Sequence, residues 1–217
     1  MIPDWRLYLI TDRHLAGPRG LHAAVADAIL GGVRAVQLRE KDLPLRTLLA
    51  LAAQMRTLTA QVGARLFING RVDVMLAVDA DGVHLRSDSL PTRAVREVIG
   101  PTRFLGVSTH CWADVERATD EGADFVTFGP VYETPAKTKY GPPTGLDALE
   151  AVCRRARVPV YALGGITRAR ILDAVAAGAY GVAMISEIIS ARDIVGSAVS
   201  CLDAVRDATS GRSVDPR

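Results

Sequence analysis

The stretch Gly122-Ala123-Asp124-Phe125-Val126-Thr127-Phe128 is one of four copies of a phrase that decides the fold. The phrase returns at residues 31–38 (GGVRAVQL), 79–85 (DADGVHL) and 178–184 (GAYGVAM). In each copy an Ala-rich, helix-like stretch ends near a small residue, and a short apolar run follows. A glycine at that point can adopt a positive φ and end a helix, and a short β-rich run is typical of a buried parallel strand. Each copy therefore predicts a helix followed closely by a strand.

Four further apolar runs lie between these copies, which gives eight strand candidates. Helical patterns fill the gaps, for example at Leu45–Gln61, Leu146–Ala156 and Arg168–Ala177. Eight strand–helix units in about 200 residues predict an α/β fold of the (β/α)8 TIM barrel type. The alternative is a doubly wound open sheet, which the lack of a Gly-x-Gly-x-x-Gly turn after the first strand weakens. The four additional runs are residues 6–10, 65–68, 104–107 and 158–163.

The chain shows no internal linker. We therefore expect a single TIM-barrel domain over residues 1–209, followed by a flexible, solvated C-terminal tail over residues 210–217.

The composition is that of an ordinary globular protein, with 49% apolar and 23% charged residues among 217. The 26 Lys and Arg nearly balance the 24 Asp and Glu, which leaves a net charge of +2. This balance argues against a protein that coats nucleic acid, and 5% aromatic residues are too few for a base-stacking surface. We expect no nucleic-acid partner, and a homo-oligomer remains possible.

Neither a membrane segment nor a metal-binding cysteine motif is expected. No apolar run reaches the roughly 18 residues of a membrane helix, and the N-terminus lacks the pattern of a signal peptide. The three cysteines, Cys111, Cys153 and Cys201, are widely spaced and form no CxxC pair. The expectation is a cytoplasmic protein with reduced thiols and no membrane contact.

Cationic and amide side chains follow the second expected strand, at the end of the barrel where active sites lie. Gln37, Arg39 and Lys41 alternate in strand fashion and so are expected to point to one side. Two cations and an amide that converge at a barrel mouth suit a phosphate or diphosphate. The alternative is that Arg39 and Lys41 are exposed charges and that Glu40 pairs with one of them.

Further candidates for anion binding follow the later strands. Gly165 follows the seventh strand and Ser186 follows the eighth, where backbone N–H groups beside a helix start form a recurring phosphate cradle. A simple tight turn is the alternative. The connection over residues 130–143 offers Thr134 and Lys137 to an anionic ligand, and it is either a lid or a structural loop.

Histidine and aspartate also occur near strand ends. His110 has the best position of the four histidines because it ends a strand, whereas His84 lies within one. A single histidine is more often structural than catalytic. Asp12 has two interpretations, as a base or as a residue that fixes the loop backbone.

Nine short motifs, in this order, resemble those of the thiamine-phosphate synthase and thiazole tautomerase family. The match runs from about residue 6 to about residue 190, and it implies the same (β/α)8 barrel. The motifs are YLITD (8–12), QLREK (37–41), IN (68–69), DGVHL (81–85), GVSTH (106–110), FGPV (128–131), TPAK (134–137), LGGI (163–166) and IS (185–186).

The resemblance implies a synthase that joins a hydroxymethylpyrimidine diphosphate to a thiazole phosphate and releases pyrophosphate with the help of Mg²⁺. It implies catalytic roles for Arg39, Lys41, Ser108 and Lys137. The substrates, small phosphorylated molecules, would be bound by Gln37, Asn69, Arg86, His110, Thr134, Gly165, Ile185 and Ser186.

The chain departs from the synthase pattern at both expected magnesium ligands. Gly70 stands where synthases carry an Asp, and Ser89 stands at the second Asp position. Because Mg²⁺ prefers carboxylate and phosphate oxygens, both expected protein anions are missing. Asp88, one residue earlier, is a candidate replacement, and Arg86 is a candidate source of positive charge in place of the metal.

Part of the sequence resembles the tautomerase branch, which needs no metal. The triplet Asn69-Gly70-Arg71 and the pair Glu133-Thr134 match that branch, but its catalytic His is Pro130 here. The intact diphosphate set favours the synthase. The alternatives are a metal-independent thiazole tautomerase and a non-catalytic binder of thiazole or thiamine phosphate.

Overall fold

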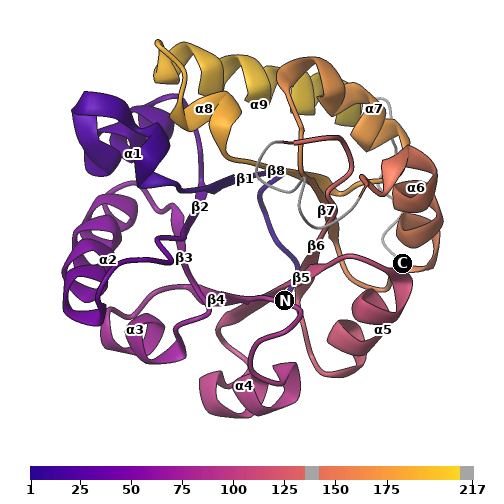
Figure 1. Cartoon of the computed structure of the whole chain (residues 1–217), viewed down its shortest axis with the longest axis horizontal. Coiled ribbons are helices and arrows are strands. Elements are labelled where there is room, and N and C mark those ends of the chain that lie inside the picture. Colours follow the sequence, from indigo (N-terminus) through magenta and orange to yellow (C-terminus); the bar gives the residue numbers. More distant parts are fainter. Residues whose placement is uncertain (135–141, 211–217) are drawn as a thin grey trace.

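Eight parallel strands close into a barrel in the computed structural model, which describes residues 1–134 and 142–210 (Figure 1). The strands pair in chain order, and β1 closes the ring against β8. The closed ring confirms the expected (β/α)8 barrel and is not compatible with an open sheet. The strands are β1 (Leu7–Ile10), β2 (Ala35–Leu38), β3 (Arg65–Asn69), β4 (Gly82–Leu85), β5 (Phe104–Thr109), β6 (Phe125–Phe128), β7 (Val160–Leu163) and β8 (Gly181–Met184).

Helices surround the strands on the outside of the barrel (Figure 1). The longest, α9, packs against both α1 and α7. The helices are α1 (Gly20–Leu30), α2 (Leu45–Ala60), α3 (Val72–Ala77), α4 (Thr92–Ile99), α5 (Trp112–Asp120), α6 (Gly145–Arg155), α7 (Ile171–Ala176), α8 (Ser186–Ile189) and α9 (Ile194–Ser210). Short 3-10 turns lie at Arg13–Leu15, Gly17–Arg19 and Arg168–Arg170. Because α9 includes Ser210, one residue of the expected tail is helical, and the rest lies outside the described residues.

Strand alternation divides the apolar residues into two cores. In β1, Leu7 and Leu9 belong to the outer core between strands and helices, whereas Tyr8 and Ile10 belong to the barrel interior. Aromatic rings fill much of that interior, with Trp5 in edge contact with Phe104 at a centroid distance of 5.0 Å. The interior is thus packed with side chains and is not a channel.

The repeated phrase places an aspartate before two strands, where it holds the preceding strand. Asp81, before β4, accepts the N–H of Leu66 in β3 at 2.9 Å. Asp124, before β6, accepts the N–H of Leu105 in β5 at 2.7 Å. Arginines neutralise both carboxylates, Arg56 for Asp81 and Arg96 for Asp124. These contacts stabilise the end of the barrel opposite the expected site.

Strand β2 ends at Leu38, so Gln37 lies within the strand, whereas Arg39 and Lys41 lie in the loop that follows it. At the start of this loop the hydroxyl of Thr11 accepts the N–H of Arg39 at 2.9 Å. That the three side chains point to one side stays a prediction. The three named helices begin and end within three residues of their expected bounds. Across the described ranges, no helix is long and apolar enough to cross a membrane.

Candidate functional site

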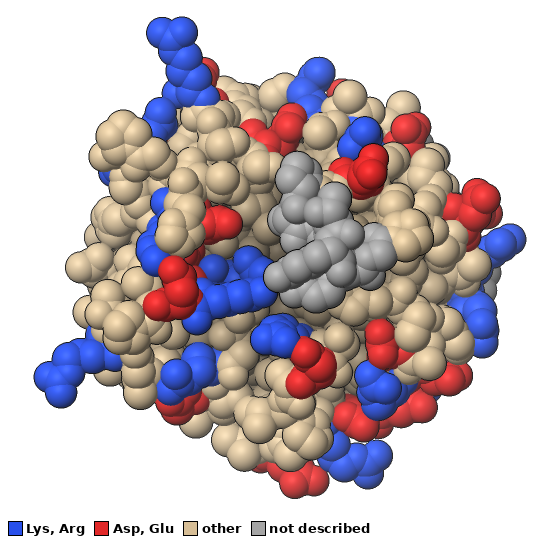
Figure 2. Space-filling view, in the orientation of Figure 1, with Lys and Arg blue, Asp and Glu red and all other residues tan. Residues whose placement is uncertain are grey.

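Positive side chains gather beside the centre of the barrel face that carries the strand carboxyl ends. Figure 2 shows Lys and Arg around this centre, over the side of the barrel formed by β2, β3 and β4. Acidic side chains lie next to several of them. The face therefore presents a local basic area on a chain whose net charge is only +2.

A buried carboxylate organises the loop after β2. Glu40 is 5% exposed, and its Oε1 accepts the hydroxyl proton of Thr11 at 2.6 Å. Its Oε2 accepts the backbone N–H of Arg13 at 3.1 Å and pairs with the Arg13 guanidinium at 3.4 Å. Arg13 also forms an ion pair with Asp42. Glu40 thus pairs with Arg13 and ties two loops together.

Gln37 is buried and begins a hydrogen-bonded network inside the barrel. Its Nε2 donates to the hydroxyl of Tyr8 at 3.1 Å, and that hydroxyl lies 3.4 Å from Nδ1 of His84. On the other side of the ring, Nε2 of His84 lies 3.1 Å from Oγ of Ser108. The hydroxyl of Thr127 approaches both, at 3.4 Å from His84 Nε2 and 3.5 Å from Ser108 Oγ. The network joins five strands, β1, β2, β4, β5 and β6.

His84 remains neutral in this network. It is 1% exposed, and burial, followed by the positive charge of Arg39, lowers the pKa of its ring to about 3. The backbone opposite makes room for the ring, because a Cβ on Gly106 would lie 2.5 Å from His84 Nδ1 and 2.5 Å from the Phe125 ring. Gly106 is therefore needed where His84 and Phe125 meet.

The residues after β3 and β4 do not form a carboxylate site for Mg²⁺. Gly70 has φ +68° and faces open space, and the hydroxyl of Ser89 donates to the backbone oxygen of Arg86 at 2.9 Å. Both carboxylate oxygens of Asp88 accept from the Arg86 guanidinium, at 2.9 and 2.6 Å, and this contact holds the Asp88 pKa below its usual range. Among described residues, no group of three His, Cys, Asp or Glu could hold a metal ion. The donor set therefore does not fit Mg²⁺.

The connection after β6 is fastened to the end of β7. Val131 and Tyr132 donate backbone N–H groups to Leu163 and Gly164, at 2.9 and 3.0 Å. A Cβ on Gly165 would lie 2.7 Å from the backbone oxygen of Glu133, so glycine permits this close approach. Thr134 follows directly and is described, whereas Lys137 lies outside the described residues. The start of the expected lid is thus a packed part of the barrel rim.

Other predicted residues take the following places. Asn69 ends β3 and is half-buried, Ile185 lies between β8 and α8, and Ser186 is the first residue of α8. The first helical turn after Gly165 begins at Arg168, and α8 begins at Ser186, so the phosphate cradle at these two strand ends stays a prediction. His110 is exposed and its Nδ1 lies 2.5 Å from the backbone oxygen of Gly129. Asp12 accepts the N–H of His14 at 3.1 Å and so fixes the loop backbone.

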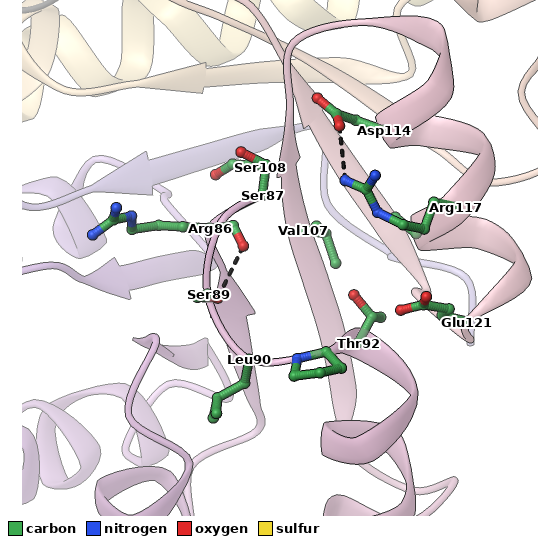
Figure 3. A pocket seen from close by; sticks show the side chains of 12 residues that line it. Arg86, Ser87, Ser89, Leu90, Thr92, Val107, Ser108, Asp114, Arg117 and Glu121 are labelled. Carbon is green, nitrogen blue, oxygen red and sulfur yellow. Dashed lines mark hydrogen bonds and ion pairs between the residues drawn. The ribbon is translucent and has the colours of Figure 1, made fainter.

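A pocket of about 250 Å³ lies between the β4–α4 loop and α5 (Figure 3). Arg86, Ser89 and Ser108 line it together with the Asp114–Arg117 ion pair, in which the two groups are 2.8 Å apart. Ser87 and Ser108 lie near one end of it in Figure 3. Of the described residues of the buried network, Ser108 is the one that is only partly buried.

Sequence reasoning missed several residues that organise this face. They all carry polar groups into the barrel interior or between loops, and a search for polar residues at inward positions of apolar strands would have found the two that lie in strands, Tyr8 and Thr127. These residues are Tyr8, Thr11, Glu40 and Thr127, and His84 was assigned only a place within a strand.

Sequence comparisons agree with this geometry. The family model described as thiamine monophosphate synthase matches residues 7–188. A protein of Geobacter sulfurreducens named "Putative thiamine-phosphate synthase" is 57% identical over 190 residues, which are 88% of this chain and 89% of that protein. The thiamine-phosphate synthase of a Roseiflexus species is 46% identical over 187 residues, 86% of this chain and 79% of the relative.

One solved structure supports the same family, and a second shares the fold. The thiamine phosphate pyrophosphorylase from Pyrococcus furiosus superimposes with a TM-score of 0.85 at 33% identity, covering 94% of this chain and 96% of that one. A 3-hexulose-6-phosphate synthase superimposes with a TM-score of 0.68 at 18% identity, covering 93% of this chain and 100% of that one, and shares the fold alone. The extent of the family match and the identity to its members show that this chain belongs to the thiamine monophosphate synthase family.

Proposed function

We propose that this chain is a transferase that makes thiamine phosphate from a hydroxymethylpyrimidine diphosphate and a thiazole phosphate. The observation that carries the proposal is the family match over residues 7–188, which spans all eight strand ends. The two relatives are named thiamine-phosphate synthase, one of them as putative, and the similar solved structure is named thiamine phosphate pyrophosphorylase. None of these names favours a tautomerase or a binder.

The chemistry requires positive charge around a departing diphosphate. The bond between the pyrimidine methylene carbon and the diphosphate oxygen breaks, and its electron pair leaves with pyrophosphate. The aminopyrimidine ring delocalises the resulting positive charge, and the thiazole nitrogen then forms the new carbon–nitrogen bond. We assign Arg39, Lys41 and Lys137 to the stabilisation of the departing negative charge, with Ser108 as a hydrogen-bond donor.

Substrate binding is assigned to the surrounding strand ends. Gln37 and Asn69 would hold the pyrimidine, and Arg86 and His110 would lie beside the diphosphate. The thiazole phosphate would be bound by Thr134, Gly165, Ile185 and Ser186. The resemblance implies Mg²⁺ as a cofactor, but the donor set after β3 and β4 does not supply its carboxylate ligands, so no step is routed through the metal.

A direct assay tests the proposal. Purified protein is incubated with both substrates, with and without Mg²⁺, and thiamine phosphate is measured. We expect turnover, and Arg39→Gln is expected to reduce it by at least tenfold through loss of a charge-assisted contact. Arg154→Gln is the matched control, because Arg154 lies exposed on α6 and pairs only with Glu150 among the described ion pairs.

Absence of product beside an active reference synthase would contradict the proposal. Calorimetry with thiazole phosphate and thiamine phosphate would then test the binder, and NMR of the thiazole carboxylate phosphate would test the tautomerase.

A further inference from the structure

The hydrogen bonds inside the barrel form a series of linked side chains, here called the hydrogen-bond chain. Among the described residues of this series, only the last is partly exposed to solvent. The chain runs from Gln37 through Tyr8 and His84 to Ser108, with distances of 3.1, 3.4 and 3.1 Å. The first three residues are at most 1% exposed, whereas Ser108 is half-buried and lines a pocket. Because water cannot complete the buried bonds, each proton in the chain must find its acceptor within the protein.

Together with the orientation of the Gln37 amide, whose Nε2 faces Tyr8, this condition sets the direction of the hydrogen bonds. The hydroxyl of Tyr8 accepts from the Gln37 amide, so its own proton needs another acceptor, and Nδ1 of His84 is the one within reach. Burial raises the pKa of Tyr8 well above its usual value, so that proton stays in place. A neutral His84 that accepts at Nδ1 carries its proton on Nε2 and donates it to Ser108.

The opposite direction leaves a buried proton without a partner. If Ser108 donated to Nε2, then Nδ1 would carry the proton and donate to Tyr8. The hydroxyl of Tyr8 would then receive two protons, from Gln37 and His84, while its own proton had no acceptor among its described contacts. A buried donor without an acceptor is strongly disfavoured.

We propose that Tyr8 and His84 are positioning residues that hold the Ser108 hydroxyl as a hydrogen-bond donor toward the barrel mouth, where it serves an anionic oxygen of the diphosphate. Ser108 Oγ accepts from His84 Nε2, and the Thr127 hydroxyl lies 3.5 Å away as a second donor. The proton of Ser108 is then left for a ligand. The identity of that ligand rests on the proposed function, but the direction of the chain does not.

Histidine NMR tests the direction without any substrate. Protein labelled with ¹⁵N at its histidines is measured between pH 5 and 8, and the His84 signals are assigned with His84→Gln. We expect one neutral tautomer with the proton on Nε2 throughout this range. A proton on Nδ1 would overturn the proposal, whether or not the protein proves to be a synthase.

The variant Tyr8→Phe tests the positioning role, with Tyr161→Phe as its matched control. Both remove a buried hydroxyl from the same aromatic layer, where the two rings lie 6.1 Å apart, but Tyr161 donates to the backbone oxygen of Trp5 at 2.6 Å. In Tyr8→Phe we expect the Nδ1 signal of His84 to move downfield, as for a ring nitrogen that accepts no hydrogen bond. Under the synthase assay, kcat should fall roughly five- to tenfold, the effect of one hydrogen bond, with KM unchanged.

Tyr161→Phe, the control, should leave the chemical shifts of His84 unchanged and should keep kcat within twofold of that of the original protein. Equal effects of Tyr8→Phe and Tyr161→Phe on kcat, or no change in either His84 signals or kcat for Tyr8→Phe, would overturn the proposal. Absence of activity in the original protein would count against the proposed function alone, because the tautomer and the shift in Tyr8→Phe are read from the free protein.

Discussion

The hydroxyl of Thr11 donates to Glu40 Oε1 at 2.6 Å and accepts the backbone N–H of Arg39 at 2.9 Å. A single fully buried oxygen therefore joins the loop after β1 to the loop after β2. Thr11→Val keeps the shape of the side chain but leaves a buried carboxylate oxygen and a backbone N–H without their partners. We expect a loss of about 2–3 kcal/mol in the free energy of unfolding, measured by urea denaturation.

The same variant is expected to weaken diphosphate binding, since Arg39 loses the bond that fixes its backbone. The KM for the pyrimidine diphosphate should rise roughly tenfold. Thr59→Val is the control, because its buried hydroxyl donates to Arg56 within α2, away from the barrel mouth. An unchanged KM in Thr11→Val would show that this bond does not position Arg39.

Gly106 is expected to tolerate no side chain. A Cβ there would lie 2.5 Å from both His84 and Phe125, whose rings are packed and cannot easily move. Gly106→Ala should reduce the free energy of unfolding by about 1–3 kcal/mol through overpacking. The double variant with Phe125→Leu gains space, so its loss should be smaller than the sum of the two single losses. Additive losses in thermal and urea unfolding would contradict a steric cause.

Burial of neutral His84 predicts that the protein loses stability as the pH falls. The unfolded chain binds a proton near the ordinary pKa of 6.5, whereas the folded protein does not bind it until pH about 3. The contribution is thus fully present above pH 6.5 and declines below it, by up to about 1.4 kcal/mol per pH unit. Urea unfolding between pH 5 and 7 measures the slope. His84→Gln should flatten it, whereas His22→Gln, on the exposed side of α1, should not.

The fold could be predicted because its signal is repeated. Four copies of one phrase mark strands β2, β4, β6 and β8, and the remaining apolar runs mark the strands between them. The end of β2 could not be placed, because Gln37 to Lys41 alternate as a strand would. The Thr11 hydroxyl and the Glu40 carboxylate end the strand there, and both contacts join segments far apart in the sequence.

The sequence predicts which residues lie at the strand ends, because that depends only on their position along the polypeptide. The family motifs place candidate residues at the strand ends, and their roles remain predictions. The partners of these residues could not be predicted, because they depend on which side chains meet across the barrel. His84 illustrates this, since its position within a strand gave no sign that it joins Tyr8 to Ser108.

Restoring the two expected carboxylates should create a dependence on Mg²⁺. Gly70 faces open space at φ +68°, a conformation that Asp adopts more readily than most residues, so Gly70→Asp should cost only about 1 kcal/mol. Ser89→Asp loses the bond to the Arg86 backbone and adds the second carboxylate. We expect the double variant to show a larger stimulation of synthase turnover by Mg²⁺ than the original protein. The measurement is the initial rate across a magnesium titration.

The pair Gly70→Asn with Ser89→Asn is the matched control, because it repeats the shape of the two new side chains without their charge. If the charged and uncharged double variants respond equally to Mg²⁺, the two positions do not face the diphosphate. A magnesium response confined to the charged variant would place both loops beside the leaving group.

Because Arg86 already pairs with Asp88 on the same loop, the new carboxylate at position 89 would also compete for that guanidinium. Adding Arg86→Gln to the charged variant should then preserve or increase its Mg²⁺ stimulation, since the metal replaces the positive charge that is lost.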